Sequence, residues 1–459
     1  MTPNTRRGLP AAAACALLAA CMHTPPAAPL EPASTLARFN ARTLPGLSGG
    51  LPAASAGWDR SQWLSAALQL NPQLGEQRAA VLAAAAAERS AAEHPNPGVE
   101  LFAEYLTASA QSTAWLYGVS MDFLLRRPAE RARARQQAAL QAALAQSELA
   151  ESIWQVRAAL RQALLDAVSA RDETALLEAL IAERQALVDS DRARVQLGDL
   201  ARTQMLADEL ELARARQRRQ QSRTRAADAV ARLAAAVGVP STALASAPVR
   251  WDDWAAIGAL QSASSERWRT DALIGRPQIT HALREYDLSQ LSLQREVARR
   301  WPQLHITPAY AWGGDGIRED ARGALDTESA LGVSFELPLF NRHQGPIAEA
   351  LARRTAAGEH LKAVQARIFE QIERAERAWP AVREAWQETG ELAALAERRS
   401  NAEERALREG ASDRAGVLAS RIAATEARLA VLAAAYTAEV AYGALEDAYH
   451  RPLEGDEAQ

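Results

Sequence analysis

Four short segments of the chain alternate between apolar and polar positions, the pattern of a β-strand with one apolar and one polar face. They run over residues 99–105, 113–123, 303–312 and 327–337. Each is roughly the length of a tilted membrane-spanning strand, about 10 residues. Aromatic residues lie towards the strand ends, namely Tyr105, Trp115, Tyr310 and Trp312. A soluble sheet packed on a helix alternates in the same way, so the pattern predicts strands and leaves open whether they face lipid.

The long stretches after these strands are dominated by helix-forming residues. Residues 129–239 contain no proline and two glycines, of which Gly198 is the natural break. Asp199 beside it is a candidate N-cap for the next helix. The sequence therefore predicts one helix over residues 129–196, roughly 100 Å long at ~1.5 Å per residue, and a partner over 200–236.

The second half of the chain repeats this plan. A helix is predicted over residues 342–408, a break at Gly410, and a second helix over 413–447. Pro380 lies inside the long helix and is expected to kink it. The last helix carries a heptad seam typical of coiled-coil packing: Leu418, Ile422, Thr425, Leu429, Leu432 and Tyr436.

The two halves also match in sequence. "YGVSMDFLL" (117–125) aligns position by position with "LGVSFELPL" (331–339), without a gap. Upstream, a helix is predicted from Trp63 to about Ala92 and its counterpart from about Ala272 to Arg300. An internal duplication of helix–strand–strand–helix–helix is the simplest account. It divides the chain into a first repeat (58–240), a linker (241–270), a second repeat (271–448) and a tail (449–459).

The N-terminus has the pattern of a targeting segment. Two arginines precede a short apolar run over residues 9–20, which ends in "LAA" before Cys21. This resembles a bacterial lipoprotein box and predicts a signal peptide over 1–20, a lipid anchor at Cys21 and an extended Pro/Ala/Ser/Gly-rich tether over 21–57. An ordinary signal peptide with a chance cysteine is the alternative. In bacterial lipoproteins an aspartate directly after the lipidated cysteine favours retention in the inner membrane. Met22 occupies that position here, which fits export to the outer membrane.

Charge and cysteine usage narrow the picture further. The net charge is −4 with both signs interspersed, which does not indicate a nucleic-acid partner. The only cysteines are Cys15 and Cys21, and Cys15 leaves with the predicted signal, so no intramolecular disulfide is expected.

With these features together, the chain resembles the TolC-like outer-membrane efflux proteins, and most closely the CzcC-type channels of heavy-metal resistance pumps. The resemblance covers residues 58–448. It rests on "ALQLNPQL", "AAEHPNPGVEL", "LGVSFELPLFNRHQG" followed by "IAEALARR", and the glycine breaks in "VQLGDL" and "REGASDRAG".

The resemblance implies a mainly helical, internally duplicated chain that forms a homotrimer. Each protomer gives four strands to one twelve-stranded barrel in the outer membrane, continuous with a helical barrel in the periplasm. The implied function is passive conduction in a tripartite efflux system, with a periplasmic adaptor and an inner-membrane RND pump as partners, without enzyme activity or cofactor. Divalent metal cations are the implied cargo; multidrug export and type I protein secretion stay open, as does a lipid-anchored periplasmic adaptor or scaffold.

The implied site residues fall in two groups. The polar strand faces line the lumen, with candidates Glu100, Glu104, Ser120, Asp122, Ser334 and Glu336. The helical turns form the periplasmic tip, where the adaptor binds and the channel closes, with candidates Leu197, Gly198, Asp199, Leu200, Gly410, Ala411, Ser412, Asp413 and Arg414. Gly416 and Ala419 stand where the family has acidic gating residues, so that contact does not carry over. Asp413 and Arg414 are candidates to replace it, with ordinary helix capping as the alternative.

Histidines are the natural ligands to consider, because a metal cargo is implied. None of the seven forms an HxxxH pair, so no structural metal site is predicted. His94 and His343 lie near strand–helix junctions, and His305 is placed on the polar side of its strand. No catalytic constellation is expected.

Overall fold

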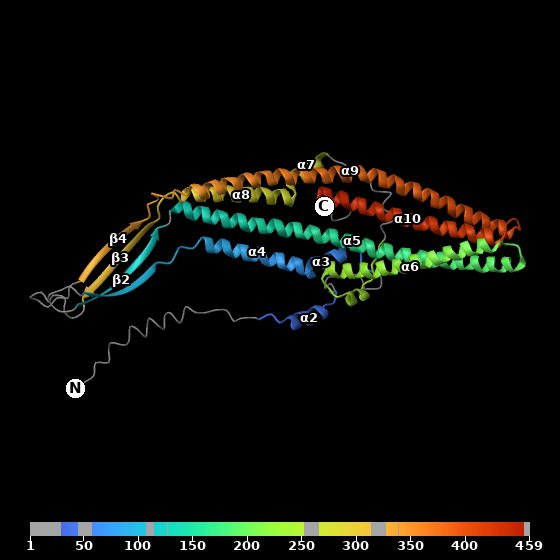
Figure 1. Cartoon of the computed structure of the whole chain (residues 1–459), viewed down its shortest axis with the longest axis horizontal. Coiled ribbons are helices and arrows are strands. Elements are labelled where there is room, and N and C mark those ends of the chain that lie inside the picture. Colours follow the sequence, from blue (N-terminus) through green and yellow to red (C-terminus); the bar gives the residue numbers. More distant parts are fainter. Residues whose placement is uncertain are drawn as a thin grey trace, which may run out of the picture.

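A computed structural model describes residues 29–44, 57–106, 114–125, 127–251, 266–313, 327–337 and 339–453. The predicted signal peptide, Cys21 and Pro338 lie outside these ranges. The molecule is elongated, with a small β-sheet at one end, two helical hairpin turns at the other, and packed helices between them (Figure 1).

Four long helices form the body, as the sequence predicts. They are α5 (Pro128–Leu197), α6 (Arg202–Val237), α9 (Gln344–Arg408) and α10 (Arg414–Tyr449). The helix α9 is continuous through Pro380 and is bowed along its length (Figure 1). None of the helices in the described ranges combines the length and apolarity needed to cross a membrane.

The helix predicted from Trp63 to Ala92 is broken into two, α3 (Arg60–Leu70) and α4 (Pro72–Ala91). The break lies at Asn71, whose Oδ1 accepts a hydrogen bond from the Gln73 backbone N–H at 2.9 Å. Proline is disfavoured inside a helix and favoured in its first turn, so Pro72 ends α3 and begins α4.

The corresponding helix of the second repeat is broken in the same way. The helix predicted from Ala272 to Arg300 is divided into α7 (Glu266–Gly275) and α8 (Pro277–Ala298). Arg276 lies at the break, with its guanidinium donating to the backbone carbonyl oxygen of Asp447 at 2.9 Å. The duplication therefore extends to a proline-marked helix break that the sequence analysis missed in both halves.

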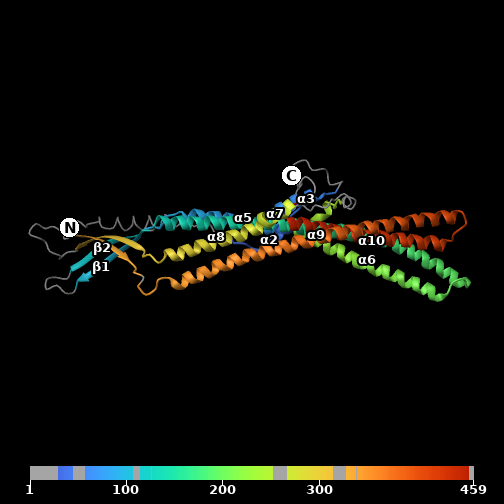
Figure 2. The same cartoon turned by 90° about the horizontal axis from the view of Figure 1, so that it is seen from above.

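The long helices pack into a layer that continues from the sheet to the hairpin turns. Nearer the sheet, α5 packs between α4 and α8, and α8 packs against α9. Nearer the turns, α5 packs between α6 and α10, and α10 packs against α9. Viewed from above, the α5–α6 and α9–α10 hairpins diverge towards their turns (Figure 2).

The sheet is antiparallel, with strand order β1 (Gly98–Leu106), β2 (Ala114–Leu125), β3 (Leu304–Gly313) and β4 (Thr327–Phe335). All four predicted strands are present, although β4 ends at Phe335, before the predicted end at Leu337. The pairing of β2 with β3 joins the two repeats, which the whole first helical hairpin separates along the chain.

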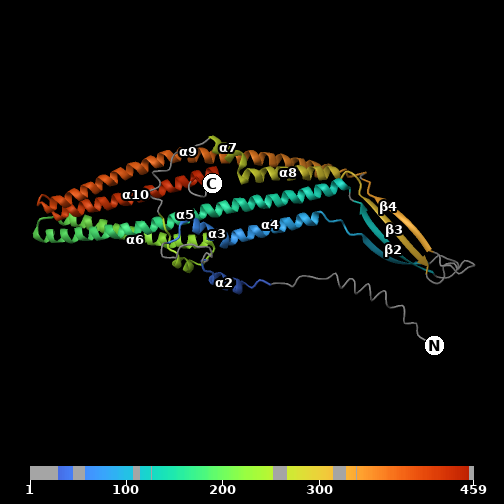
Figure 3. The same cartoon turned by 180° about the vertical axis from the view of Figure 1, so that it is seen from behind.

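Segments predicted as linkers are partly folded onto the body. Within the predicted tether, α2 (Pro32–Asn40) is helical, and Arg42 donates to the carbonyl oxygen of Gly238 at 2.9 Å. The predicted linker contains the 3-10 helix η2 (Ser241–Ser246), and Trp251 beyond it is buried in the core around α3 and α5. Seen from behind, α2 lies below α3 and the end of α6 (Figure 3).

Candidate functional site

The sheet exposes one apolar face along all four strands. Leu101 is 78% exposed and Leu331 71% exposed, far above the exposure of a packed core residue. Other exposed members are Val99, Met121, Phe123, Leu304, Val333 and Phe335. A contiguous apolar surface of this kind marks contact with lipid or with another protein.

Aromatic rings gather at the end of this face that lies away from the helices. Tyr105 pairs with Trp115 across the β1–β2 ladder, and their ring centroids are 4.9 Å apart. Tyr117 pairs with Trp312 across β2–β3, and the ring centroids of Tyr310 and Trp312 are 6.1 Å apart. The register brings the predicted aromatic residues together at one edge of the sheet, an arrangement that the interfacial girdles of membrane barrels also have.

The opposite face carries the polar residues predicted to line a lumen. Glu100 pairs with Ser120, and Ser334 pairs with His305. Glu104 lies opposite Leu116 on the same face, so the polar character weakens towards the aromatic end. Glu336 follows the last residue of β4 and lies outside the sheet.

Near the helices this face holds a polar cluster that the sequence analysis did not assemble. His305 Nδ1 lies 3.0 Å from Asp122 Oδ2, and the Thr307 hydroxyl donates to Asp122 Oδ1 at 3.4 Å. Asp122 lies on β2, and His305 and Thr307 lie on β3, 183 and 185 positions further along the chain. Only the register of the two repeats brings them together.

Phe102 covers Gly118 on the same face. The ring lies directly over the glycine, so a Cβ at position 118 would overlap it. Gly118 is buried beneath the ring, although the sheet has no second layer in the described ranges. An aromatic ring placed over a cross-strand glycine shields the backbone of the sheet there.

The first hairpin turn is closed by backbone hydrogen bonds. Gly198 has a φ of 81°, and the Asp199 N–H donates to the Arg194 carbonyl oxygen at 2.9 Å. Asp199 is therefore part of the C-terminal closure of α5, and the predicted N-cap role is wrong because Ala201 precedes α6. Leu197 is 76% exposed at this turn, and Leu200 is half-buried.

The second turn is capped by a side chain. Gly410 has a φ of 74°, and the Ala411 N–H donates to the Ala406 carbonyl oxygen at 2.8 Å. Asp413 Oδ1 accepts the Gly416 N–H at 2.7 Å, which makes Asp413 the N-cap of α10. Ser412 and Arg414 flank this cap. The capping alternative thus accounts for Asp413.

A pair of carboxyl groups lies just behind the first turn. Asp191 on α5 is 3% exposed, and its neighbours are Asp208 on α6 and, at 3.9 Å, the Arg194 guanidinium. Burial and the facing Asp208 carboxyl raise the pKa of Asp191 above its ordinary value. Sequence reasoning missed this pair, since the two residues belong to different helices.

The hairpins are joined at mid-length by a buried ion cluster. Glu446 on α10 is 1% exposed and accepts hydrogen bonds from Arg161 at 2.7 Å and from Arg157 at 3.2 Å, both on α5. Arg161 also reaches Asp447 at 2.5 Å. Burial opposes ionisation of Glu446, yet the two guanidinium groups outweigh it and lower its pKa.

The same region anchors the end of α10. The His450 ring stacks on Trp154 with centroids 4.2 Å apart, and its Nε2 lies 3.5 Å from Glu151 Oε2. The interaction with His450 is the largest cause that lowers the pKa of Glu151 to about 2, against burial and with help from Gln278 and Gln155. The predicted tail is therefore packed at its start.

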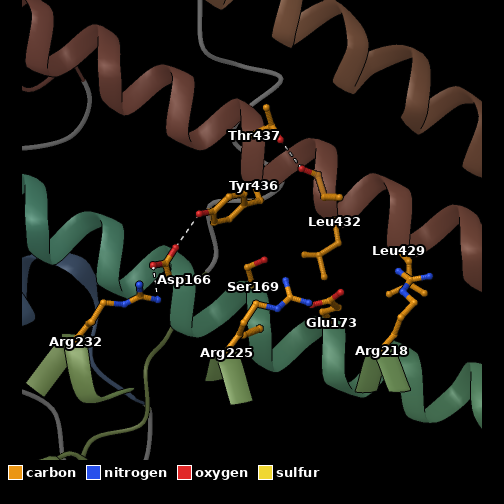
Figure 4. A pocket seen from close by; sticks show the side chains of 12 residues that line it. Asp166, Ser169, Glu173, Arg218, Arg225, Arg232, Leu429, Leu432, Tyr436 and Thr437 are labelled. Carbon is orange, nitrogen blue, oxygen red and sulfur yellow. Dashed lines mark hydrogen bonds and ion pairs between the residues drawn. The ribbon is translucent and has the colours of Figure 1, made fainter. Parts of the chain in front are cut away.

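A groove of about 440 Å³ lies over α5 between α6 and α10 (Figure 4). Its charged groups include two ion pairs: Arg232 with Asp166 at 3.1 Å and Arg225 with Glu173 at 2.7 Å. The Tyr436 hydroxyl donates to Asp166 Oδ1 at 2.8 Å, and burial together with this carboxylate raises the tyrosine pKa. These contacts join α5, α6 and α10. Because the charged groups named here pair with one another, we assign the groove a role in helix packing.

The remaining histidines are dispersed. His94 contacts Arg131, His343 lies 3.8 Å from Glu296, and both His281 and His360 lie 3.7 Å from Glu285. Within the described ranges, no three His, Cys, Asp or Glu side chains are arranged to hold a metal ion.

No protein-family model and no curated protein sequence matches the chain. Solved structures do match it along most of its length. VceC, an outer membrane protein of Vibrio cholerae, gives a TM-score of 0.67 at 16% identity and covers 86% of this chain and 97% of its own. The CmeC outer membrane channel of Campylobacter jejuni gives 0.68 at 12% identity, covering 93% of each chain.

The MtrE outer membrane channel of Neisseria gonorrhoeae, solved in its open state, gives a TM-score of 0.65 at 15% identity and covers 85% of this chain and 88% of its own. At such identities the likeness concerns the fold. The order of helices and strands, the four-stranded sheet and the two long hairpins together give this chain the fold of TolC-like outer-membrane channels.

Proposed function

We propose that the protein is the outer-membrane channel of a tripartite efflux system, and that it conducts substrate passively from a pump and adaptor to the exterior. The observation that carries the proposal is the agreement of fold, over most of the chain, with proteins described as outer membrane channels. The uncovered apolar face of the sheet supports it, since a soluble protein of this size would bury that face.

The proposal includes assembly into a homotrimer with a twelve-stranded barrel. The strands β1 and β4 are the edges of the described sheet, so each has one side without a strand partner in the order given. In lipid, open edges leave backbone N–H and C=O groups unsatisfied, and closure by further copies removes them. The apolar face then contacts lipid, and the face with Glu100, Ser120 and Asp122 lines the lumen.

Cys21 is proposed as the lipid anchor, on the sequence pattern around it. Intact-mass measurement of the membrane-extracted protein tests this directly. A mature chain starting at residue 21 with added acyl mass supports the anchor, and Cys21→Ser is expected to lose that mass. An unmodified N-terminus at another residue would overturn it.

The hairpin turns are proposed as the periplasmic tip that meets the adaptor. The exposed Leu197 and the two left-handed glycine turns lie together at the end opposite the sheet. Leu197→Asp is expected to weaken adaptor capture without changing membrane insertion. Leu36→Asp on α2, another exposed leucine, is the matched control.

Metal cations are proposed as the cargo. The support is the acidic character of the polar sheet face, where Glu100, Glu104 and the Asp122–His305 pair repeat in each copy. Carboxylate rings concentrate cations near a pore wall. Cargo is tested by deletion and growth on zinc, cobalt, cadmium, copper and a drug panel, where unchanged metal tolerance with new drug sensitivity contradicts the metal assignment.

The channel proposal itself is tested with purified protein in planar bilayers. A conducting pore is expected, with cation preference that falls in the Glu100→Gln/Asp122→Asn variant and is kept in Glu359→Gln, a surface change on α9. Fractionation of cell membranes gives an independent test of whether the protein is inserted as a barrel. Recovery of a monomer from the membrane without detergent would exclude a barrel.

A further inference from the structure

The exposed apolar face of the sheet ends, on the side of the helices, in a cavity of about 620 Å³, the apolar cavity. A row of three apolar side chains lines it, paired in register across β2, β3 and β4: Leu125, Leu304 and Phe335. Trp301, between α8 and β3, lines it too and is 67% exposed. The cavity lies where the sheet meets the helices (Figure 1), so an apolar chain that follows the sheet face leads into it.

A second cavity, of about 210 Å³, adjoins the first and shares the lining residues Glu130 and Gln303 with it. It lies between the end of α4, the start of α5 and the end of α8. Its charged lining residues are four arginines and a single glutamate: Arg131, Arg133, Arg295, Arg299 and Glu130. This basic cavity therefore has a positive excess directly beside an apolar one.

The acidic residues at the start of α5 and the end of α8 are already paired. Glu130 accepts a hydrogen bond at 3.1 Å from Arg127, which also donates to the Ala298 carbonyl oxygen at 3.1 Å. Glu296 accepts a hydrogen bond at 2.9 Å from Arg299. These two carboxylates thus neutralise Arg127 and Arg299, and the other arginines of the basic cavity keep their charge.

Three half-buried arginines of the basic cavity have no carboxylate partner among the residues that the structure describes. Arg131 contacts the His94 ring at 2.6 Å, and Arg295 donates to the side-chain oxygen of Gln137. Arg133 is the third. Guanidinium groups present N–H donors in a fork that matches the oxygens of a phosphate, so an uncompensated group of them favours a phosphate ligand.

The arrangement occurs once in the chain, despite the internal duplication. The helix α5 has three arginines in its first eight residues, whereas its counterpart α9 has none before Arg353. The last turn of α8 and the two residues after it contain Arg295, Arg299 and Arg300, whereas the last turn of the counterpart α4 contains Arg89 alone. A general attraction to a membrane surface is served equally well by both repeats, so the asymmetry points to one specific ligand.

We propose that the two cavities form a binding site for one anionic phospholipid per chain. Arg131, Arg133 and Arg295 bind the phosphate, while an acyl chain occupies the apolar cavity between Trp301 and the row of three apolar side chains. The charge of the basic cavity selects an anionic lipid, and an indole at the level of the headgroups is typical of membrane proteins. The inference rests on the proposed insertion of the sheet in a membrane.

Native mass spectrometry of the full-length protein in detergent tests the site, with phosphatidylglycerol and phosphatidylcholine as probes. One phosphatidylglycerol per chain is expected to stay bound under conditions that release phosphatidylcholine. Arg131→Gln/Arg133→Gln is expected to weaken phosphatidylglycerol binding about 30-fold, because each arginine near a membrane surface contributes about fivefold. The matched control Arg374→Gln/Arg377→Gln removes two exposed charges of α9 and is expected to change binding less than about twofold. Equal losses in the two variants overturn the site.

Ligands that lack long acyl chains test the apolar cavity. Dihexanoyl phosphatidylglycerol and inorganic phosphate are each expected to bind at least about tenfold more weakly than the long-chain lipid, since every buried CH₂ group contributes about fourfold. Inorganic phosphate that displaces the long-chain lipid at equal concentration would show a site for a free anion and overturn the proposal.

The mass of the assembly in the same spectra separates this inference from the proposed channel. A trimer that binds the two lipids equally contradicts the phospholipid site only, and a monomer that retains one phosphatidylglycerol contradicts the channel only. The preference of the wild-type protein between the two lipids requires no substitution, so the test stays decisive if a variant does not fold.

Discussion

Arg161 on α5 donates a hydrogen bond from Nη1 to Glu446 Oε2 on α10 at 2.7 Å, and the carboxylate is 1% exposed. Arg161→Met removes this hydrogen bond and leaves Glu446 paired with Arg157 alone. It is therefore expected to lower the free energy of unfolding in detergent by about 1.5–3 kcal/mol, the range for a hydrogen bond to a charged group. Glu349→Gln, which breaks an exposed pair on α9, is expected to cost less than about 1 kcal/mol. Equal losses in the two variants would show that the buried cluster contributes no more to stability than an exposed ion pair.

Glu151 gives a pH dependence in the acid range. Its folded pKa of about 2 lies below the ordinary 4.5, chiefly through His450, so the carboxylate stabilises the fold at pH above 4.5. That contribution is lost as pH falls from 4.5 towards 2, and amounts to about 1–2 kcal/mol after solvent screening. The free energy of unfolding measured against pH is expected to be flatter for Glu151→Gln over this window. Parallel curves for the variant and wild type would refute the assignment.

The pH dependence of stability expected from Asp191 has the opposite sign to that expected from Glu151. Burial and Asp208 raise its folded pKa, so ionisation destabilises the hairpin as pH rises through that value. Asp191→Asn is expected to stabilise the α5–α6 hairpin at pH 7 by on the order of 1 kcal/mol, with no gain at pH 3 where both forms are neutral. Hydrogen exchange near the turn measures this. Asp189→Asn, with a side chain 56% exposed, is the control and is expected to change little.

The Phe102–Gly118 contact predicts a coupled pair in the sheet. Gly118→Val places a side chain in the volume of the Phe102 ring and is expected to reduce assembly into heat-resistant oligomers. Phe102→Ala removes the obstacle, so the double variant is expected to recover part of the loss, with a coupling of about 0.5–3 kcal/mol. Gly98→Ala, where a Cβ meets only Asp122 Cβ at 3.7 Å, serves as the tolerated control. Additive losses in the double variant would rule out the contact.

The turn glycines predict a purely conformational cost. No atom lies within 4 Å of a Cβ built at Gly198 or Gly410, yet their φ angles are 81° and 74°. Replacing either with alanine is expected to destabilise its hairpin by about 1–2 kcal/mol, seen as faster hydrogen exchange at the turn. Gly75→Ala within α4, equally free of neighbours, is expected to stabilise the protein by about 0.5–1 kcal/mol. A stabilising effect at Gly198 would show that the turn does not need the left-handed conformation.

Runs of helix-forming residues without proline predicted the first pair of long helices, a heptad seam supported the last, and period-two alternation predicted all four strands. The helix breaks at Asn71 and Arg276 were missed because a proline ends one helix and begins the next without interrupting the apolar pattern. The strand faces and the positions of Glu100, Ser120 and Asp122 followed from alternation.

The contacts between repeats could not be predicted in this way. Arg161 and Glu446 are 285 residues apart, and nothing in either local pattern specifies the other. The Asp122–His305 pair depends on the register between β2 and β3, which period-two alternation leaves free to shift by two residues. The Asp199 cap was wrong because backbone closure at Gly198 already occupies that residue.

The location of the Glu446 cluster has a mechanical consequence. It clamps α10 to α5 near one end of α10, and the rest of that helix, back to Arg414, projects from the clamp towards the turn. At about 1.5 Å per residue this is a lever arm of roughly 48 Å, so a tilt of about 10° at the clamp displaces the turn by about 8 Å. Such a tilt has to break the contacts that also hold α10 to α5 between the cluster and the turn, among them Arg184 with Glu426 at 2.5 Å and Tyr436 with Asp166 at 2.8 Å, so these side chains set the stiffness of the lever arm.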